Sequence, residues 1–268
     1  MVGRSALSAP FFHDVEAAYA KLESILWPHG PMCPRCGCLD RITDVRGKTA
    51  RMGLRYCGHC KRQFTVTVGT VFERSKVPLN LWLQAAHLLC SSKKGMSSHQ
   101  IHRILGVQYN TAWFMTMRLR EAMRDGKFIP LGGDDKVVET DTTWVGGKEK
   151  NKHKSKRTNK GRGAVGKEAA FSLIERDGRV RSFHLPEVNA KTLRPILKAQ
   201  IDERSYLMTD DGGEYRRLGV EFAGHGTVNH SAGEYVRTGG FHHTNTIENY
   251  FSILKRGITG TYHHVSQQ

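Results

Sequence analysis

The sequence lacks the long hydrophobic segments that carry a protein into or across a membrane. No apolar run reaches about 18 residues, the length that a membrane-spanning helix needs. The first ten residues also lack the apolar core of a secretory signal. We therefore expect a cytoplasmic protein without a membrane partner. In that reducing compartment the 6 cysteines are expected to bind metal rather than to form disulfides.

Acidic residues are scarce relative to basic ones. The chain has 25 Asp and Glu against 41 Lys and Arg, which gives a formal net charge of +16. No segment pairs this charge with a long apolar face, so a membrane surface is a poor candidate for the partner. The surplus favours a polyanion, and nucleic acid is the one expected. With 268 residues and 38% hydrophobic content, the chain has room for one large domain or two to three small ones.

Four segments are predicted along the chain. A polar stretch with glycines, from 124 to 135, is the clearest boundary. Well before it, apolar residues at helical spacing predict a helix over 11–27 with Asp14 as its N-cap. We assign an N-terminal helix, a zinc ribbon, a helix-turn-helix region and a C-terminal α/β domain to residues 1–29, 30–72, 73–128 and 134–268.

Two CxxC pairs in the second segment predict a zinc site. Their spacing of about 20 residues is that of a four-cysteine site, and they contribute Cys33, Cys36, Cys57 and Cys60. Four thiolates close a tetrahedral, structural Zn²⁺ site with no open position. A small hairpin is expected from residue 41 onward, and a further strand over 62–68. Cys38 is interpreted as a bystander, His59 as a non-ligand and Cys90 as a small buried residue.

The third segment predicts three helices, over 78–90, 97–105 and from 109 onward, with a tight turn at Gly106. Two helices joined by a short glycine-containing turn match the outline of a helix-turn-helix. In that motif the first residues of the later helix contact base edges in the major groove. The candidates for this contact are Gln108, Tyr109, Asn110 and Thr111. The alternative is a plain three-helix packing unit without DNA contacts.

Beyond residue 134 the pattern changes to alternating strands and helices. Strands are predicted near 136–145, 169–174, 180–185, 206–210 and 220–222, with a helix over 192–201. Asp177 and Gly178 are typical of a tight hairpin turn. Between the first two strands, residues 148–167 form a basic run too polar to pack. We interpret it as a loop that contacts phosphates, with Lys154, Lys156 and Arg157 as representatives.

A last helix is predicted to begin near Asn245 and to stop at Gly257. Asn245 is a candidate N-cap, and Glu248 then stands at the capping-box position. Glu248 and Lys255 are two helical turns apart, so their side chains share one face. Glu248 is therefore either a capping residue or a metal ligand beside a DNA contact at Lys255 and Arg256.

The order of these elements predicts a ribonuclease H-like fold, a mixed sheet flanked by helices. In such a sheet an acid in the first strand and one at the end of the fourth lie side by side, and a helix can add a third. The candidates are Asp141, Asp210 and Glu248. Carboxylates crowded together repel one another unless a cation is bound. Mg²⁺ prefers such oxygen ligands, and two ions can support phosphoryl transfer.

Three motifs resemble those of the bacterial zinc-ribbon insertion-sequence DDE transposases. The first contains Val138–Glu139–Thr140–Asp141 followed by Trp144–Val145–Gly146–Gly147–Lys148. The second contains Thr209–Asp210–Asp211 and Tyr215, and the third contains His243–Thr244–Asn245–Thr246–Ile247–Glu248, Lys255 and Arg256. The front end, with Trp27–Pro28–His29–Gly30 before the CxxC ribbon, is also similar. The resemblance thus covers nearly the whole chain.

This resemblance implies a DNA transposase that nicks transposon ends and joins the freed 3′-hydroxyl to target DNA. It implies catalytic Mg²⁺, or Mn²⁺ in its place, at Asp141, Asp210 and Glu248, structural Zn²⁺ in the ribbon, and a homo-oligomer on DNA in the bacterial nucleoid. The sequence departs from the family at Thr142, where a second acid is usual. It also stops at Gln268, where the family continues, so we expect a C-terminally truncated catalytic domain.

Two other functions remain open at this point. One is a zinc-ribbon and helix-turn-helix DNA-binding protein with an inactive or truncated ribonuclease H-like domain. The other is a nuclease that cleaves strands without joining them. Among the remaining polar residues, Glu139 lies on the strand face of Asp141 and is a further candidate near the metals. The roles of Asp211 and His243 are left open between site and structure.

Overall fold

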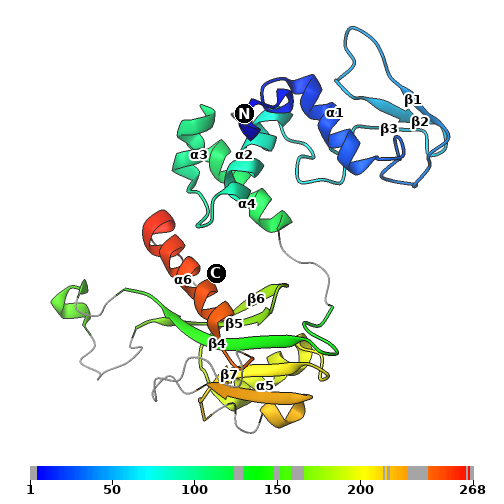
Figure 1. Ribbon diagram of the computed structural model, residues 1–268. Helices are drawn as coiled ribbons and strands as arrows, with labels where there is room; N and C mark the ends of the chain where they lie inside the picture. Colours follow the sequence, from blue (N-terminus) through cyan, green and yellow to red (C-terminus); the bar gives the residue numbers. More distant parts are fainter. Residues whose placement is uncertain are drawn as a thin grey trace. The chain divides into compact units, whose positions relative to one another are not determined.

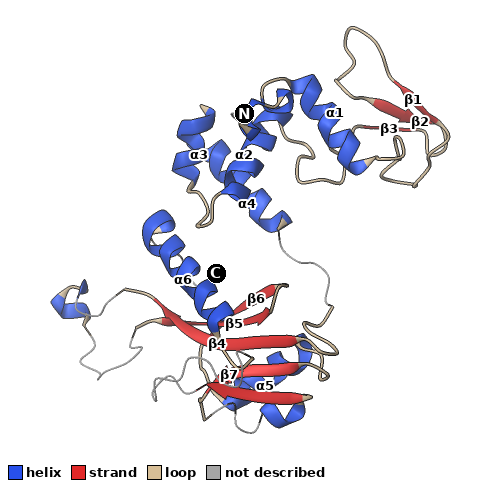
Figure 2. Cartoon of the chain, in the orientation of Figure 1, coloured by secondary structure: helices blue, strands red, loops and turns tan. Residues whose placement is uncertain are grey.

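The computed structural model describes residues 5–123, 129–147, 151–157, 166–213, 215, 218–228, 241–263 and 265. The chain forms two compact units, residues 1–124 and 125–268 (Figures 1 and 2). The boundaries between the four segments proposed from the sequence stay a prediction. Within the described ranges, no helix is long and apolar enough to cross a membrane.

The first α-helix of the first unit is α1, Val15–Leu26. The carboxylate of Asp14 accepts a hydrogen bond of 2.7 Å from the amide of Ala17, so the predicted N-cap is confirmed. The predicted start at residue 11 is four residues early, because a short 3₁₀ helix, Pro10–Phe12, precedes the cap.

A three-stranded antiparallel sheet forms the ribbon, in the order β1-β2-β3. Its strands are β1 (Ile42–Asp44), β2 (Arg55–Cys57) and β3 (Arg62–Phe64). The predicted hairpin corresponds to β1 and β2, whereas the strand predicted over 62–68 ends at Phe64. Trp27 packs edge-on against Phe64, with ring centroids 5.9 Å apart, and so joins the end of α1 to the ribbon.

Three helices follow, at the predicted positions: α2 (Leu79–Ser91), α3 (Ser98–Leu105) and α4 (Tyr109–Ala122). Ser97 and Gln100 form a capping box at the start of α3, and Gly106 ends it with a φ of 67°. The buried face of α2 includes Trp82, Ala85 and Leu89. Cys90 is exposed, so its predicted burial is wrong, because it follows that face by one position in the helix.

The second unit contains a five-stranded sheet in the order β6-β5-β4-β7-β8. Its strands are β4 (Val137–Val145), β5 (Glu168–Glu175), β6 (Val180–Leu185), β7 (Tyr206–Asp210) and β8 (Gly224–Val228). The first three strands pair antiparallel, and β7 and β8 join in parallel. This arrangement confirms the predicted ribonuclease H-like layout.

The predicted last strand, over 220–222, is wrong. Residues Gly219–Glu221 form a 3₁₀ helix, and the strand is β8, which begins at Gly224. Two glycines make β8 hard to recognise, because glycine disfavours strands in general. Here the lack of a Cβ has a reason at both positions. A Cβ on Gly224 would lie 2.5 Å from the Tyr206 ring, and one on Gly226 would collide with the His242 ring and lie 2.5 Å from the Met208 sulfur.

Helices cover the two faces of this sheet. Helix α5 (Ala190–Gln200) buries Leu193 and Leu197 in the main core together with Val138 of β4. On the other face, α6 (Asn245–Gly257) packs on β4 and β5 and buries Ile247 and Phe251 against Ile174. Alternate residues of β4 thus face α5 and α6, as expected for a strand.

The burial of apolar side chains under α5 leads to a prediction about the stability of this unit. Leu193→Ala removes a fully buried side chain and is expected to lower the free energy of unfolding by about 2–5 kcal/mol. Lys191→Ala, exposed on the same helix, should change it by less than about 0.5 kcal/mol. Urea denaturation of the full chain, followed by circular dichroism, measures both. Equal losses in the two variants would contradict the assigned core.

Candidate active site and metal centre

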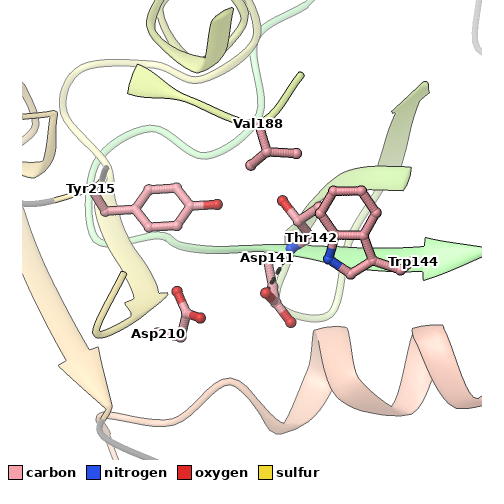
Figure 3. Close-up of a pocket in the computed structure, with 6 residues that line it drawn as sticks. All are labelled: Asp141, Thr142, Trp144, Val188, Asp210 and Tyr215. Carbon is pink, nitrogen blue, oxygen red and sulfur yellow. Dashed lines mark hydrogen bonds between the residues drawn. The ribbon is translucent and has the colours of Figure 1, made fainter. Parts of the chain in front are cut away.

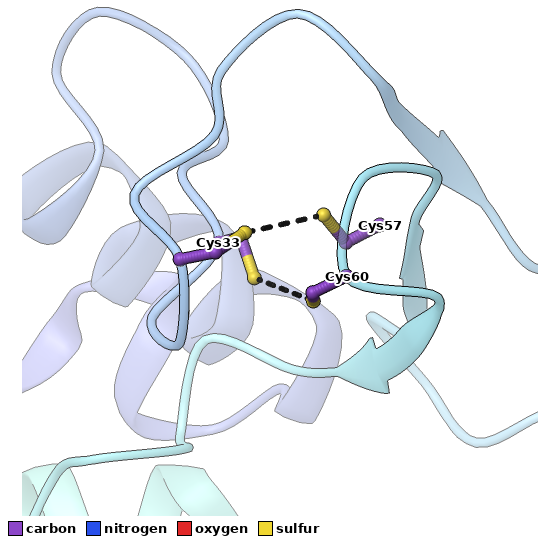
Figure 4. Close-up of side chains that lie close together, drawn as sticks. Cys33, Cys57 and Cys60 are labelled. Carbon is purple, nitrogen blue, oxygen red and sulfur yellow. Dashed lines mark hydrogen bonds between the residues drawn. The ribbon is translucent and has the colours of Figure 1, made fainter.

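The four cysteines of the ribbon form a compact sulfur cluster. All four Sγ atoms lie within 4.8 Å of one another. The Sγ atoms of Cys33 and Cys60 are 3.7 Å apart, and those of Cys36 and Cys57 are 3.6 Å apart (Figure 4, in which Cys33, Cys57 and Cys60 are labelled). A backbone hydrogen bond from Cys60 lowers the pKa of the Cys57 thiol to about 6, which favours a thiolate. The donors suit a tetrahedral metal ion, and Zn²⁺ fits them.

The neighbouring candidates lie outside this cluster, as predicted. Cys38 donates a hydrogen bond from its sulfur to Asp40 at 3.0 Å. His59 is exposed between two of the clustered cysteines and is not a member of the group. The metal centre therefore consists of two cysteines from each CxxC pair.

Asp141 and Asp210 line one cavity of about 250 Å³ in the second unit. They belong to the parallel strands β4 and β7, where Glu139 pairs with Met208, so two residues further on the acids lie side by side. The amide of Thr142 donates to Asp141 Oδ1 at 2.6 Å and fixes that carboxylate. Figure 3 shows the side chains of Asp141 and Thr142 extending from β4 in opposite directions.

Glu248 lines a second cavity, of about 560 Å³, which also includes Asp141 and Lys255. Glu248 is in the first turn of α6 and Lys255 in its last, as the predicted shared face requires. Asp141 therefore belongs to both cavities, with Asp210 in one and Glu248 in the other. Among the described residues, only the four cysteines form a metal-ligating group within 4.8 Å, so the three acids are more widely spread than that.

Tyr215 is a buried member of the first cavity that the sequence marked only by its place in a motif. Its side chain is 2% exposed, and its hydroxyl points towards Thr142 in Figure 3. Burial raises the pKa of Tyr215, and the nearby charges of Asp141 and Asp210 raise it further. The phenol therefore stays neutral and keeps a proton to donate beside the two acids.

Trp144 and Lys167 complete the walls of the site. Trp144 lines both cavities and is 42% exposed, while Lys167 lines the second cavity with Lys255. The sequence placed Trp144 only in a motif and Lys167 only at the end of a basic run. Their position beside Asp141 depends on the pairing of β4 with β5, in which Trp144 lies opposite Ala169.

The start of α6 differs from the prediction. Thr244, rather than Asn245, occupies the N-cap position, and no side chain of the cap residue bonds the helix. The capping carboxylate comes from Glu139 of β4, which accepts a hydrogen bond of 2.9 Å from the amide of Ile247. Glu248 is thus not needed as a cap. The sequence shows Glu139 two positions before Asp141, but no pattern in it indicates that Glu139 caps α6.

The residues predicted to bind DNA are spread over several elements. Gln108 is the N-cap residue of α4, where it and Asn110 are exposed and Thr111 is half-buried. Lys255 and Arg256 are exposed at the end of α6. Lys154 is the first residue of a short 3₁₀ helix, Lys154–Lys156, and Arg157 is its C-cap residue. Neither lines either of the two cavities, and the side chain of Lys156 lies outside the described residues.

Comparison with known proteins identifies the family. Residues 130–268 match the model of the ISXO2-like transposase domain. The chain belongs to this transposase family. Residues 14–63 match the transposase zinc-ribbon domain. A relative from Halobacterium salinarum, an uncharacterized protein in transposable element ISH50, is 28% identical over 249 residues, which cover 89% of this chain and 81% of the relative.

Solved structures give more distant likenesses. A chain of the simian T-cell lymphotropic virus intasome is 14% identical, with a TM-score of 0.30, and the match covers 63% of this chain and 64% of that chain. The Mos1 strand transfer complex is 12% identical, with a TM-score of 0.21, over 66% of this chain and 74% of that chain. Similarity at this level adds nothing to the family assignment.

The assigned zinc ligands can be tested by comparing the zinc content of two variants. Cys36→Ser leaves three thiolates and is expected to lose zinc and loosen the ribbon, because a structural site needs all four ligands. Cys38→Ser, two positions away but outside the cluster, is expected to keep its zinc. Metal analysis of the two purified full-length proteins measures this. Equal zinc contents would refute the assigned ligand set.

Proposed function

We propose that this transposase is a Mg²⁺-dependent enzyme that nicks DNA at the ends of its mobile element and transfers the freed 3′-hydroxyl to target DNA. The observation that carries the proposal is the pair of cavities that meet at Asp141. One cavity adds Asp210, and the other adds Glu248 with two lysines. Both lie within the part of the chain that matches the transposase domain.

The donor chemistry of these cavities fits Mg²⁺. Asp141, Asp210 and Glu248 offer hard carboxylate oxygens, and neither cavity is lined by a cysteine or histidine among the described residues. Their separation leaves room for waters or phosphate oxygens, which Mg²⁺ keeps in its shell. When bound, the ions lower the charge repulsion at the scissile phosphate and stabilise the attacking and leaving oxygens.

The residues around the acids have roles that follow from their charge. Lys167 and Lys255 line the cavity of Glu248, where their ammonium groups can hold the phosphates of the substrate strand. Thr142 keeps the Asp141 carboxylate in one orientation through its amide. Tyr215 forms part of the wall of the Asp141–Asp210 cavity, and its neutral hydroxyl is buried and points towards Thr142.

In this proposal the first unit recognises the DNA at the ends of the mobile element. The zinc ribbon has a structural role, because its four clustered cysteine sulfurs would hold one Zn²⁺ with no open position. Gln108, Asn110 and Thr111 at the start of α4 contact base edges at the element ends. Lys154, Lys156, Arg157 and Arg256 contact backbone phosphates. The protein works as a homo-oligomer on DNA, because transposition requires two element ends to be joined to one target.

Substitution of the acids tests the chemistry. Asp141→Asn, Asp210→Asn and Glu248→Gln are each expected to lower strand cleavage and strand transfer by at least about 100-fold, because each removes a charge that holds Mg²⁺. A labelled element end, a target plasmid and Mg²⁺ provide the assay, and end binding should be retained.

Asp211→Asn is the matched control, since Asp211 is exposed next to Asp210 and lines neither cavity. Its activity should equal that of the unaltered protein. A wild-type protein that binds the element end but yields neither nicked nor joined product would refute the enzyme. Nicked product without joined product would identify a nuclease instead.

Two further variants separate base recognition from phosphate binding. Asn110→Ala should weaken binding to the element end by about 1–3 kcal/mol and leave binding to random DNA unchanged. Lys255→Ala should weaken binding to both and lower the salt dependence by about one ion. Titrations of both duplexes at several salt concentrations measure this. Equal losses on both duplexes in Asn110→Ala would argue against the helix-turn-helix assignment.

A further inference from the structure

Glu139 is a fully buried carboxylate that the proposed chemistry does not use. Its side chain has 0% exposure, on the face of β4 that carries Asp141 two residues later. A buried charge is unfavourable unless it is paired and hydrogen-bonded. Every partner that the structure gives to Glu139 comes from Arg176 or from the segment 243–247, and none comes from the cavities of the acids.

The first partners belong to the first turn of α6. The amide of Ile247 donates to Oε2 of Glu139 at 2.9 Å, and the hydroxyl of Thr246 donates to Oε1 at 2.9 Å. Free amides at a helix N-terminus, with the positive end of the helix dipole, form a favourable site for a carboxylate. Ile247 directly precedes Glu248, so Glu139 holds the turn that presents Glu248.

Arg176 also contacts Glu139, from the end of strand β5, which pairs with β4. It follows the end of β5, and its Nε donates to Oε1 of Glu139 at 2.7 Å. Its two terminal nitrogens donate to the carbonyl oxygens of Phe241 and His243, each at 2.9 Å. A guanidinium spreads five donors over three nitrogens in a fixed plane and so reaches three separate partners, whereas the three donors of a lysine share one nitrogen. Arg176 thus fastens the residues before α6 to the same carboxylate.

His243 adds a contact in the same place. Its Nδ1 lies 3.2 Å from Oε1 of Glu139 and 3.3 Å from the amide nitrogen of Asn245. These contacts connect the strand of Asp141 to the helix of Glu248 through groups that are fixed by hydrogen bonds at every step. They engage both oxygens of Glu139, which is fully buried and lines neither of the two cavities of the acids.

We propose that Glu139 and Arg176 are positioning residues of the active site, which set the distance of Glu248 from Asp141 and so determine how tightly Mg²⁺ is held. This inference rests on the proposed function for its effect on catalysis. Its structural part, the fastening of α6, does not depend on that function. The two parts are therefore tested by separate measurements on the same full-length proteins.

The test compares Glu139→Gln and Arg176→Lys with Glu175→Gln. Glu175 is a matched control: it is buried at 6% exposure and pairs with Lys136 at 2.6 Å, and none of the contacts that the structure gives it reaches α6. Glu139→Gln is expected to raise the Mg²⁺ concentration needed for half-maximal cleavage by about 10- to 100-fold. Excess Mg²⁺ should restore much of the rate, and zinc content and end binding should not change.

Hydrogen–deuterium exchange supplies the measurement that does not require activity. Faster exchange is expected in peptides covering 241–251 of Glu139→Gln and Arg176→Lys, and no change is expected there in Glu175→Gln. Unchanged exchange in this segment, or an equal effect of Glu175→Gln, would overturn the fastening. An unchanged Mg²⁺ requirement in an active Glu139→Gln protein would overturn its positioning role. If the unaltered protein does not cleave, the proposed function fails while the exchange result still decides the fastening.

Discussion

The buried pair of Glu139 and Arg176 is the interaction on which the position of α6 depends. Among the described residues, this helix buries Ile247 and Phe251 against Ile174, and the partly buried Tyr250 and Leu254 pack beside them. Such contacts resist separation but allow sliding and rotation, because dispersion and the hydrophobic effect have little direction. Hydrogen bonds to a fully buried carboxylate are directional. Removing one partner of a fully buried pair costs about 3–5 kcal/mol, which is an upper value here because the Arg176 side chain is 19% exposed. The pair therefore adds the orientation that packing alone leaves open.

The sheet imposes the second constraint on the site. Asp141 and Asp210 are neighbours because β4 and β7 run parallel in register, with Glu139 opposite Met208. The alternation of β4 then directs Val138 into the core under α5 and Glu139 towards α6. A shift by one residue would exchange these faces and bury Asp141 in the apolar core. Strand β4 thus determines both the register that aligns the two aspartates and the position of α6.

Much of the fold was predictable from the sequence, because its signals are local. The CxxC pairs, the helices of the first unit and the strands that contain Asp141 and Asp210 all follow from spacing over fewer than about 20 residues. Three features could not be predicted from local spacing: Thr244 as the N-cap residue, the burial of Glu139, and strand β8. Glu139 and Thr246 are 107 positions apart, so no local pattern joins them. β8 is disguised by glycines whose reason is the neighbouring Tyr206 and Met208 side chains.

The long separation in sequence between Glu139 and α6 also affects the order in which the parts of this unit can fold during synthesis. A ribosome releases β4 and β5 well before α6, so the sheet can pair while Glu139 and Arg176 still await the amides and carbonyls of residues 241–247. Until those arrive, the charged pair has water as its other partner. Docking of α6 then removes that water and places Glu248 in the same event. The placement of Glu248 is therefore a later event than the formation of the strand that carries Asp141.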